Sequence, residues 1–401
     1  MYFSRNTLLS FICFGLLYIV SNGVASAQTD YLYVTDYGAG TDDPAVGGNM
    51  DRYQFTYNSG TNTITNFTPY GAGGNTSNAV FITGGIKEGV QGTDNDIIAV
   101  ATGGASLNRY NFSGSEIGSI AVTLNGSPYT FNTVGNIVLS PDGQYVYVPE
   151  QGAGLIDKVS LATGAIVAQV NFPGAHDLLL VNGTLYAAAY SGYTTGVSDG
   201  IWTFNTSLAS AHQMVLGTAF GSATPTGMSF SGTTLYVNGN IPPTSPGDAT
   251  VANSVFEFNI PTPGGTAATL INSYSSSNLS FIFGNSLGPD GNLYIAGLGG
   301  ASGRTDDGYT DGVYEFNTTS NAVSLLVGGE SGTSTTGPPG SSGLYSPKYL
   351  QFSPNFIAAP DAGFSGPEPG AIGMFCSMGV AGAGWFWRRK KRGGSHTPKV
   401  L

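Results

Sequence analysis

The chain has few charged residues and almost no cysteine. The shortage of cysteine excludes several kinds of stabilising and catalytic site. Only 9% of its 401 residues are charged, and its two cysteines, Cys13 and Cys376, fall in apolar segments near the termini. The body between them therefore has no disulfide and no cysteine metal site, so its stability has to come from packing. The body has two histidines, His176 and His212, which excludes most nucleophile and transition-metal arrangements.

Basic side chains are scarce in the same region. Residues 28–366 include six basic and 23 acidic residues, a balance of −17. Nucleic acid is therefore excluded as a partner, because phosphate binding needs clustered lysine and arginine. Such an acidic surface suits a soluble extracellular protein and can collect divalent cations.

Glycine and aromatic residues are abundant instead. The chain has 61 glycines, 12% aromatic residues and 41% hydrophobic residues. The aromatic content argues against disorder, and the glycines lack the period of three that collagen requires. Many short β-type runs separated by Gly, Asn, Ser and Thr predict an all-β fold.

Residues 286–317 are the clearest copy of a repeated unit. Pro289, Asp290 and Gly291 predict a reverse turn, because proline fixes φ and glycine accepts positive φ. A short apolar strand follows at residues 293–295, and a strand of alternating polar and apolar residues follows at 313–316. These features are typical of one propeller blade.

The same pair of strands occurs six times, at intervals of 43 to 58 residues. The first strands are residues 32–34, 97–100, 146–148, 185–187, 235–237 and 293–295, and their partners are residues 52–55, 109–112, 158–161, 201–204, 255–258 and 313–316. A repeat of this length predicts blades arranged in a ring. We therefore predict a six-bladed β-propeller, or a seven-bladed one if an irregular insert holds a degenerate unit.

The first and last β-segments of the body each lack a partner. Residues 31–36 match the second strand of a unit, and residues 348–354 match a first strand. We predict that they pair to complete a shared blade, because this pairing covers the strand edges of an open ring. The second blade is the least regular: residues 79–82 are its predicted first strand, and residues 83–95 are the insert in place of a tight turn.

Two of the predicted turn-and-strand sequences are similar to those of known propellers. Residues 140–148, SPDGQYVYV, and residues 288–295, GPDGNLYI, carry the similarity. They resemble blades of NHL-type, YVTN-type and gluconolactonase-like propellers. The resemblance supports the fold and says little about activity, because propellers host many functions.

The N-terminal residues are typical of an export signal. Residues 1–27 contain Arg5, a short apolar run and the small-residue site Ala25, Ser26 and Ala27. This pattern predicts a secretory signal peptide that is cleaved before Gln28. The predicted propeller then occupies residues 28–356, and the Pro/Gly-rich residues 357–366 read as a linker.

Three features follow one another near the C-terminus. Pro367, Glu368 and Pro369 precede an apolar stretch at residues 371–387, and the basic cluster Arg388, Arg389, Lys390, Lys391 and Arg392 ends it. The apolar stretch just suffices for a membrane-spanning helix, with the cluster on the cytoplasmic side. The order over residues 367–392 resembles the PEP-CTERM sorting signal of Gram-negative bacteria. A plain membrane anchor is the alternative.

This resemblance implies an exported protein and a partner. PEP-CTERM proteins are recognised by an exosortase, a transpeptidase-like membrane protease that removes the tail. The implied precursor is transiently anchored in the inner membrane, with residues 393–401 as a cytoplasmic tail. The implied mature form lies at the cell surface or is secreted into the extracellular matrix.

Acidic residues gather in the long loops of the predicted ring. Loops between second and third strands and connections between blades share one face, where propellers usually bind ligands. That face is expected to carry Asp36, Asp42, Asp43, Glu150, Asp199, Asp306, Asp307 and Asp311. His176 precedes a first strand and is expected near the central channel. With Glu150 and Asp36 it could form a calcium site of hard oxygen ligands, although a hydrogen-bonded histidine is the simpler interpretation.

These observations favour a binding protein over an enzyme. We expect a propeller without a cofactor that binds extracellular polysaccharide or a surface protein through its acidic face. The alternative is a metal-dependent propeller lactonase or lyase that acts on an extracellular sugar derivative.

Overall fold

The computed structural model describes residues 27–36, 49–69, 86–91, 96–101, 103–111, 116–189, 199–241, 253–276, 279, 282–297, 312–328 and 347–352. The chain divides into two compact units, Met1–Asp361 and Ala362–Leu401, and every described residue belongs to the first. The predicted linker and PEP-CTERM segment, and the signal peptide apart from Ala27, lie outside the described residues. No helix in the described part of the chain is long and apolar enough to cross a membrane.

The described strands form six four-stranded antiparallel sheets, which we number as blades 1 to 6. From the inner to the outer strand, blade 1 is β26 (Pro347–Phe352), β1 (Ala27–Asp36), β2 (Asn49–Asn58) and β3 (Thr63–Pro69), and blade 2 is β4 (Ile86–Gln91), β5 (Asp96–Ala101), β6 (Ser106–Asn111) and β7 (Glu116–Ala121). Blade 3 is β10 (Val138–Leu139), β11 (Tyr145–Glu150), β12 (Leu155–Ser160) and β13 (Ile166–Asn171), and blade 4 is β14 (Ala175–Val181), β15 (Thr184–Ala189), β16 (Gly200–Asn205) and β17 (His212–Leu216). Blade 5 is β18 (Thr224–Ser231), β19 (Thr234–Asn240), β20 (Asn253–Asn259) and β21 (Thr269–Ser276), and blade 6 is β22 (Ile282–Leu287), β23 (Leu293–Gly297), β24 (Gly312–Phe316) and β25 (Val323–Gly328). A hairpin, β8 (Thr123–Leu124) with β9 (Ser127–Pro128), and a short 3-10 helix, η1 (Gly217–Phe220), lie in the connections between blades.

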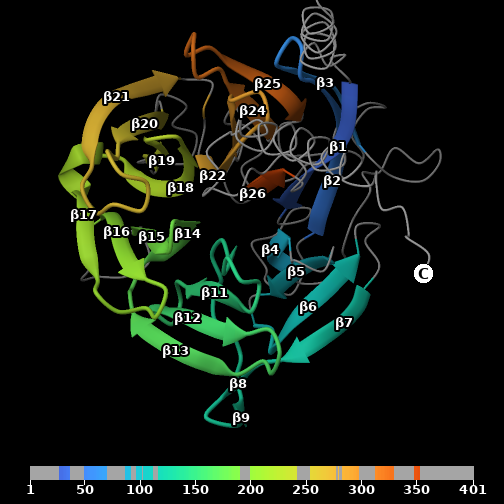
Figure 1. Cartoon of the computed structure of the whole chain (residues 1–401), viewed down its shortest axis with the longest axis vertical. Helices are drawn as coiled ribbons and strands as arrows, with labels where there is room; N and C mark the ends of the chain where they lie inside the picture. The colour runs from blue at the N-terminus through green and yellow to red at the C-terminus, as the bar shows by residue number, and fades with distance from the viewer. Residues whose placement is uncertain are drawn as a thin grey trace, which may run out of the picture. The chain divides into compact units, whose positions relative to one another are not determined.

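The blades follow one another around a central axis, so the all-β, six-bladed propeller prediction is confirmed (Figure 1). Neighbouring inner strands contact one another around the axis, as β14 does with β18, β18 with β22, and β22 with β26. Strands β13, β17, β21 and β25 lie at the outer rim (Figure 1).

The last described strand pairs with the first, as predicted. In the antiparallel register of β26 and β1, Leu32 lies opposite Phe352 and Val34 lies opposite Leu350. The rings of Phe352 and Phe55 then meet edge to face, with centroids 5.4 Å apart. This pairing completes blade 1 from both ends of the described chain and covers the strand edge that would otherwise be open.

The predicted inner strand of blade 2 is wrong. Residues 79–82 were expected to pair with residues 97–100, but β4, at Ile86–Gln91, takes that position and pairs with β5. The connection from β4 to β5 then spans only residues 92–95, which closes at a smaller entropy cost than the predicted insert. Residues 79–82 lie outside the described part of the chain.

Six hydrophobic clusters hold the ring together, and each joins one pair of neighbouring blades. The second strand of each blade is buried on both faces, as the 0% exposure of Val146, Tyr147 and Val148 shows for β11. A tyrosine of the repeat reaches the next blade: the hydroxyl of Tyr147 donates to the carbonyl oxygen of Thr206 at 2.8 Å. The repeated sequence therefore fastens blades together as well as building each one.

The fourth, outer strand of each blade was not predicted from the sequence. These strands are mostly exposed, as the pattern of β7 shows, and several of their apolar side chains face solvent, including Ile117, which is 55% exposed. Without a buried face, such segments lack the alternation that marks a strand in a sequence.

Candidate functional site

Two kinds of connection share one face of the ring, which we call the loop face. Because the strands of each blade are antiparallel, the connections between second and third strands leave from the same side as the connections between blades. The described part of this face includes residues 151–154, 172–174 and 217–223. The tight turns between first and second strands, such as Asn182 and Gly183, lie on the opposite side, which we call the turn face.

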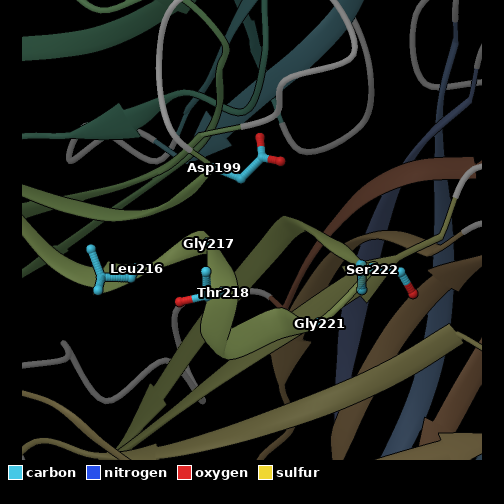
Figure 2. A pocket seen from close by; sticks show the side chains of 7 residues that line it. Asp199, Leu216, Gly217, Thr218, Gly221 and Ser222 are labelled. Atoms are coloured by element: carbon cyan, nitrogen blue, oxygen red, sulfur yellow. The ribbon is translucent and has the colours of Figure 1, made fainter.

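A pocket opens on the loop face between Asp199 and the connection from blade 4 to blade 5 (Figure 2). The cavity has a volume of about 390 Å³ and is lined by Asp199, Leu216, Gly217, Thr218, Gly221, Ser222 and Ala223. This volume falls in the range of about 300–1,000 Å³ that is common for small-ligand sites. We call it the Asp199 pocket.

Packing beneath the pocket fixes the connection in place. Phe220, at the end of η1, is 3% exposed and packs edge to face on Phe256 of blade 5, with ring centroids 4.9 Å apart. The 3-10 turn ends at Gly221, whose φ of 64° favours glycine. Buried Phe220 therefore anchors the turn and leaves Thr218 and Ser222 on its outer side.

Asp199 is held against the same connection by its backbone. The side-chain amide of Gln213 on β17 donates to the carbonyl oxygen of Asp199 at 3.3 Å. A side chain at Gly217 would collide with the same carbonyl group, because its Cβ would lie 2.6 Å from the oxygen. Glycine at position 217 thus allows the turn to approach Asp199 closely.

The polar groups of the pocket can accept and donate hydrogen bonds. The Asp199 atom Oδ1 is buried and has no hydrogen-bond partner among the described residues, and Figure 2 draws the carboxylate pointing away from the turn that carries Thr218 and Ser222. Thr218 and Ser222 are exposed, and a hydroxyl both donates and accepts. Asp199 was among the acidic residues predicted on this face; Thr218 and Ser222 were missed, because nothing distinguishes them from the many other hydroxyl residues of the loops.

His176 lies on the inner strand β14 and is 1% exposed. Its Nδ1 lies 2.8 Å from the hydroxyl oxygen of Tyr349 on β26 and 3.2 Å from the carbonyl oxygen of Thr226 on β18. Its ring stacks on Phe283 of β22, with centroids 5.1 Å apart. Inner strands of blades 1, 4, 5 and 6 therefore meet at this imidazole.

The roles of these contacts depend on the tautomer of His176. The carbonyl oxygen of Thr226 can only accept, so it forms a hydrogen bond with Nδ1 in the tautomer that carries its proton there. The Tyr349 hydroxyl donates in turn to the carbonyl oxygen of His176 at 3.0 Å. His176 and Tyr349 thus form a buried hydrogen-bonded pair across the ring.

Glu150 lies at the loop-face end of β11, but its side chain is fully buried. Its two carboxylate oxygens accept hydrogen bonds from the Tyr129 hydroxyl, at 2.6 Å, and from the backbone N–H of Asn132. Burial and the hydrogen bond to Glu150 raise the pKa of Tyr129. Glu150 thereby holds the connection from blade 2 to blade 3 against the sheet.

Asp157 on β12 is a fully buried neighbour of Glu150 that sequence reasoning missed. Its Oδ1 accepts from the side-chain amide of Gln169 at 2.8 Å. Burial and the hydrogen bond with Glu150 raise the pKa of the Asp157 carboxyl, because two close carboxylates in a dry site do not both ionise readily.

Asp177, next to His176, is a second buried carboxyl that sequence reasoning missed. It links three blades: Asn136 donates to its Oδ1 at 2.7 Å, and the backbone N–H of Met228 donates to its Oδ2 at 2.6 Å. Burial raises the pKa of Asp177 to about 7, although the hydrogen bonds oppose the shift. No sequence signal separates such a buried carboxyl from an exposed one, because its burial depends on residues far along the chain.

The remaining predicted acids lie at the end of β1 or outside the described residues. Asp36 ends β1, opposite Asn49 and Pro347 in the sheet, and its side chain lies outside the described set. The other acids predicted on this face lie outside the described residues: Asp42, Asp43, Asp306, Asp307 and Asp311. Among the side chains that the structure describes, no three of His, Cys, Asp or Glu come together as metal ligands.

No protein-family model matches this chain, and a comparison with curated proteins finds no match. Solved structures of similar fold include a chain of a nidogen–laminin complex, 11% identical, which covers 81% of this chain and 98% of that one with a TM-score of 0.49. The periplasmic gluconolactonase PpgL of Pseudomonas aeruginosa is 15% identical, with coverage of 81% and 99% and a TM-score of 0.47. Hydrazine synthase of Kuenenia stuttgartiensis is 13% identical, with coverage of 69% and 92% and a TM-score of 0.41. At these identities the likeness concerns the fold and carries no argument about activity.

Proposed function

We propose that this propeller is an exported protein of the cell surface or extracellular matrix that binds polysaccharide through its loop face and catalyses no reaction. The observation that carries the proposal is the Asp199 pocket, whose lining includes Asp199, Thr218 and Ser222 and which opens on the face where propellers usually hold ligands. The acidic balance of residues 28–366 supports a solvent-exposed extracellular role.

Export and sorting form the second part of the proposal. The signal-like residues 1–27 and the motif Pro367, Glu368 and Pro369, with its apolar stretch and basic cluster, support recognition by an exosortase. Replacing the three motif residues by alanine tests this part directly. Sorting predicts that the variant keeps its tail and stays with the inner membrane, whereas an unchanged size and location contradict it.

The lactonase or lyase alternative needs an accessible metal centre. Glu150 and His176, two of the three residues considered for such a centre, are buried and hydrogen-bonded to protein groups. The binding function therefore has the better support from the described residues.

Two assays on the purified protein separate binding from catalysis. Retention on the extracellular polysaccharide of the producing cells, without release of smaller products, supports the proposal. Hydrolysis of a sugar lactone that is abolished by chelation and restored by calcium overturns it. Retention by a surface protein alone also overturns the choice of polysaccharide as ligand.

A further inference from the structure

We propose that Glu150 and Asp157 form a pH-sensitive latch, which holds the connection from blade 2 to blade 3 against its sheet in acidic medium and loosens as the medium becomes alkaline. The latch is a regulatory device of the fold and involves no ligand. It is separate from the Asp199 pocket, so it goes beyond the proposed function.

The register of blade 3 places the two carboxyls on the same face of the sheet. Strands β11 and β12 are neighbours (Figure 1), and Val148 on β11 lies opposite Asp157 on β12. Glu150 follows Val148 by two residues, so its side chain points to the same face and is a diagonal neighbour of Asp157. Val148 packs in the hydrophobic cluster between blades 2 and 3. The two carboxyls, which are both fully buried, therefore lie between these blades.

One oxygen of the pair has no donor from another group. Asp157 Oδ1 accepts from Gln169 at 2.8 Å, whereas Oδ2 is buried and no described group donates to it. Both oxygens of Glu150 already accept, from Tyr129 and from the backbone of Asn132. Ionised carboxylates only accept, so the hydrogen bond between Asp157 and Glu150 requires a proton. The closed pair therefore holds one proton and carries one negative charge.

The surrounding side chains offer no cation for a second negative charge. Among the described groups, Tyr129 is the other titratable one that faces the pair, and Gln169 on β13 is neutral. Lys158 points to the opposite face of the sheet, where it donates to blade 4. Arg109 on blade 2 is paired with Asp96, at the turn-face end of that blade. Loss of the shared proton therefore leaves two like charges close together in a dry site, where they repel each other.

Opening of the connection should consequently depend on pH. Burial and the hydrogen bond with Glu150 raise the pKa of Asp157 to about 8, above its ordinary value of about 3.9. Opening admits water and returns the pKa towards that ordinary value, so the closed form binds more protons between about pH 4 and pH 8. The advantage of the closed form is complete below about pH 4 and is lost as pH rises to 8. Within this window the ratio of open to closed forms rises by up to about tenfold per pH unit.

The latch acts on the backbone of the connection. Glu150 accepts from the N–H of Asn132, and the N–H of Gln151 donates to the carbonyl oxygen of Thr133 at 2.8 Å. Phe131 is 1% exposed and packs in the cluster between blades 2 and 3. Because Gln151 begins a described part of the loop face, loosening these contacts changes that face.

Hydrogen exchange of the purified protein from pH 5 to pH 8 tests the latch. Protection factors, which divide out the intrinsic pH dependence of exchange, are measured for the amides of Asn132 and Gln151. We expect them to fall by up to about tenfold per pH unit. The amide of Ile260 in blade 5, which donates to the carbonyl oxygen of Thr233, should change less. Protection that stays constant with pH at Asn132 and Gln151 overturns the proposal.

Asp157→Asn separates a latch from a merely structural carboxylate. The asparagine amide can donate to Glu150 while its oxygen accepts from Gln169, so the variant imitates the protonated acid. We expect protection that no longer depends on pH and that exceeds the wild-type value at pH 8. Glu116→Gln removes an acid from an exposed position on β7 and should leave the wild-type profile unchanged.

Three results contradict the latch. The first is a pH slope that survives in Asp157→Asn, and the second is protection at pH 8 that calcium raises and EDTA lowers, because the pair then binds a metal ion. The third comes from carbon-13 shifts of aspartate carboxyls in the wild-type protein, which decide the matter if the variant does not fold. Titration of Asp157 near pH 4 overturns the proposal, and titration well above it supports the shared proton. None of these results bears on polysaccharide binding.

Discussion

The hydroxyl oxygen of Tyr349 lies 2.8 Å from Nδ1 of His176, and this contact joins the closing blade to the blade opposite it in the ring. Tyr349 belongs to β26, which is far from His176 in sequence and closes blade 1 beside β1. Both residues are buried, at 4% and 1% exposed. The contact therefore ties the closure of the ring to its centre.

Removing the Tyr349 hydroxyl should weaken this closure. In Tyr349→Phe, Nδ1 of His176 keeps its contact with the Thr226 carbonyl oxygen, so we expect a loss of only about 1–2 kcal/mol in the free energy of unfolding. Tyr57→Phe is a matched control, because its hydroxyl bonds to Asn62 at an exposed site. Urea unfolding of both variants measures the difference, and equal effects contradict the assigned role.

Burying a charge in the closing strand should be far more damaging. Leu350 is 8% exposed and lies opposite Val34, so Leu350→Asp should cost about 3 kcal/mol or more. Leu325 on the outer strand β25 is 43% exposed, and Leu325→Asp should change stability by less than about 1 kcal/mol. Thermal unfolding of the two variants measures the difference in stability. A tolerated Leu350→Asp would show that the ring does not depend on β26.

Gly135→Ala tests a close approach between blades 3 and 4. A Cβ at position 135 would overlap the carbonyl oxygen of His176, and the next residue, Asn136, donates its N–H to that oxygen at 3.1 Å. The backbone must shift to admit the methyl group, so we expect a loss of about 1–3 kcal/mol. An unchanged midpoint of urea unfolding would show that the backbone around Gly135 shifts at little cost in free energy.

The raised pKa of Asp177 predicts a pH dependence of stability. The folded carboxyl has a pKa of about 7, above the unfolded value of about 3.9. The folded state therefore binds more protons between these values, and the stabilisation present below about pH 4 is lost as pH rises towards 7. The loss is on the order of 4 kcal/mol over that window.

Asp177→Asn isolates this contribution, because asparagine does not titrate. Urea unfolding at half-unit steps from pH 4 to pH 8 should show a shallower decline for the variant, by up to about 1.4 kcal/mol per pH unit. Parallel curves for the two proteins would mean that Asp177 does not titrate in this range.

Local sequence pattern predicted the parts of the fold that depend on local pairing. The strands around Leu293 and Tyr314 alternate or run apolar, and their residues pair as expected. Closure of the ring also followed from the pattern, because the end segments around Tyr33 and Gln351 each lacked a partner. The outer strands were not predicted because they have no buried face. Strand β4 was not predicted because residues 79–82 match the pattern of a buried strand more closely.

The burial and the hydrogen-bond partners of the site residues could not be predicted from the local sequence pattern, because they depend on contacts between distant parts of the chain. Asp199 was placed on the correct face by the repeat, but its orphaned oxygen depends on surrounding packing. Glu150 was expected as a surface acid, yet Tyr129 and Asn132 enclose it. Tyr349 was predicted as a strand residue, and its partnership with His176 spans the whole ring.

Binding at the loop face is the central claim, and amide chemical shifts of the labelled protein test it most directly. The titrant is a short oligosaccharide cut from the extracellular polysaccharide that retains the protein. The account predicts that the largest shifts fall on Thr218, Gly221 and Ser222. Largest shifts at Gly183 or Gly291 on the turn face would contradict it.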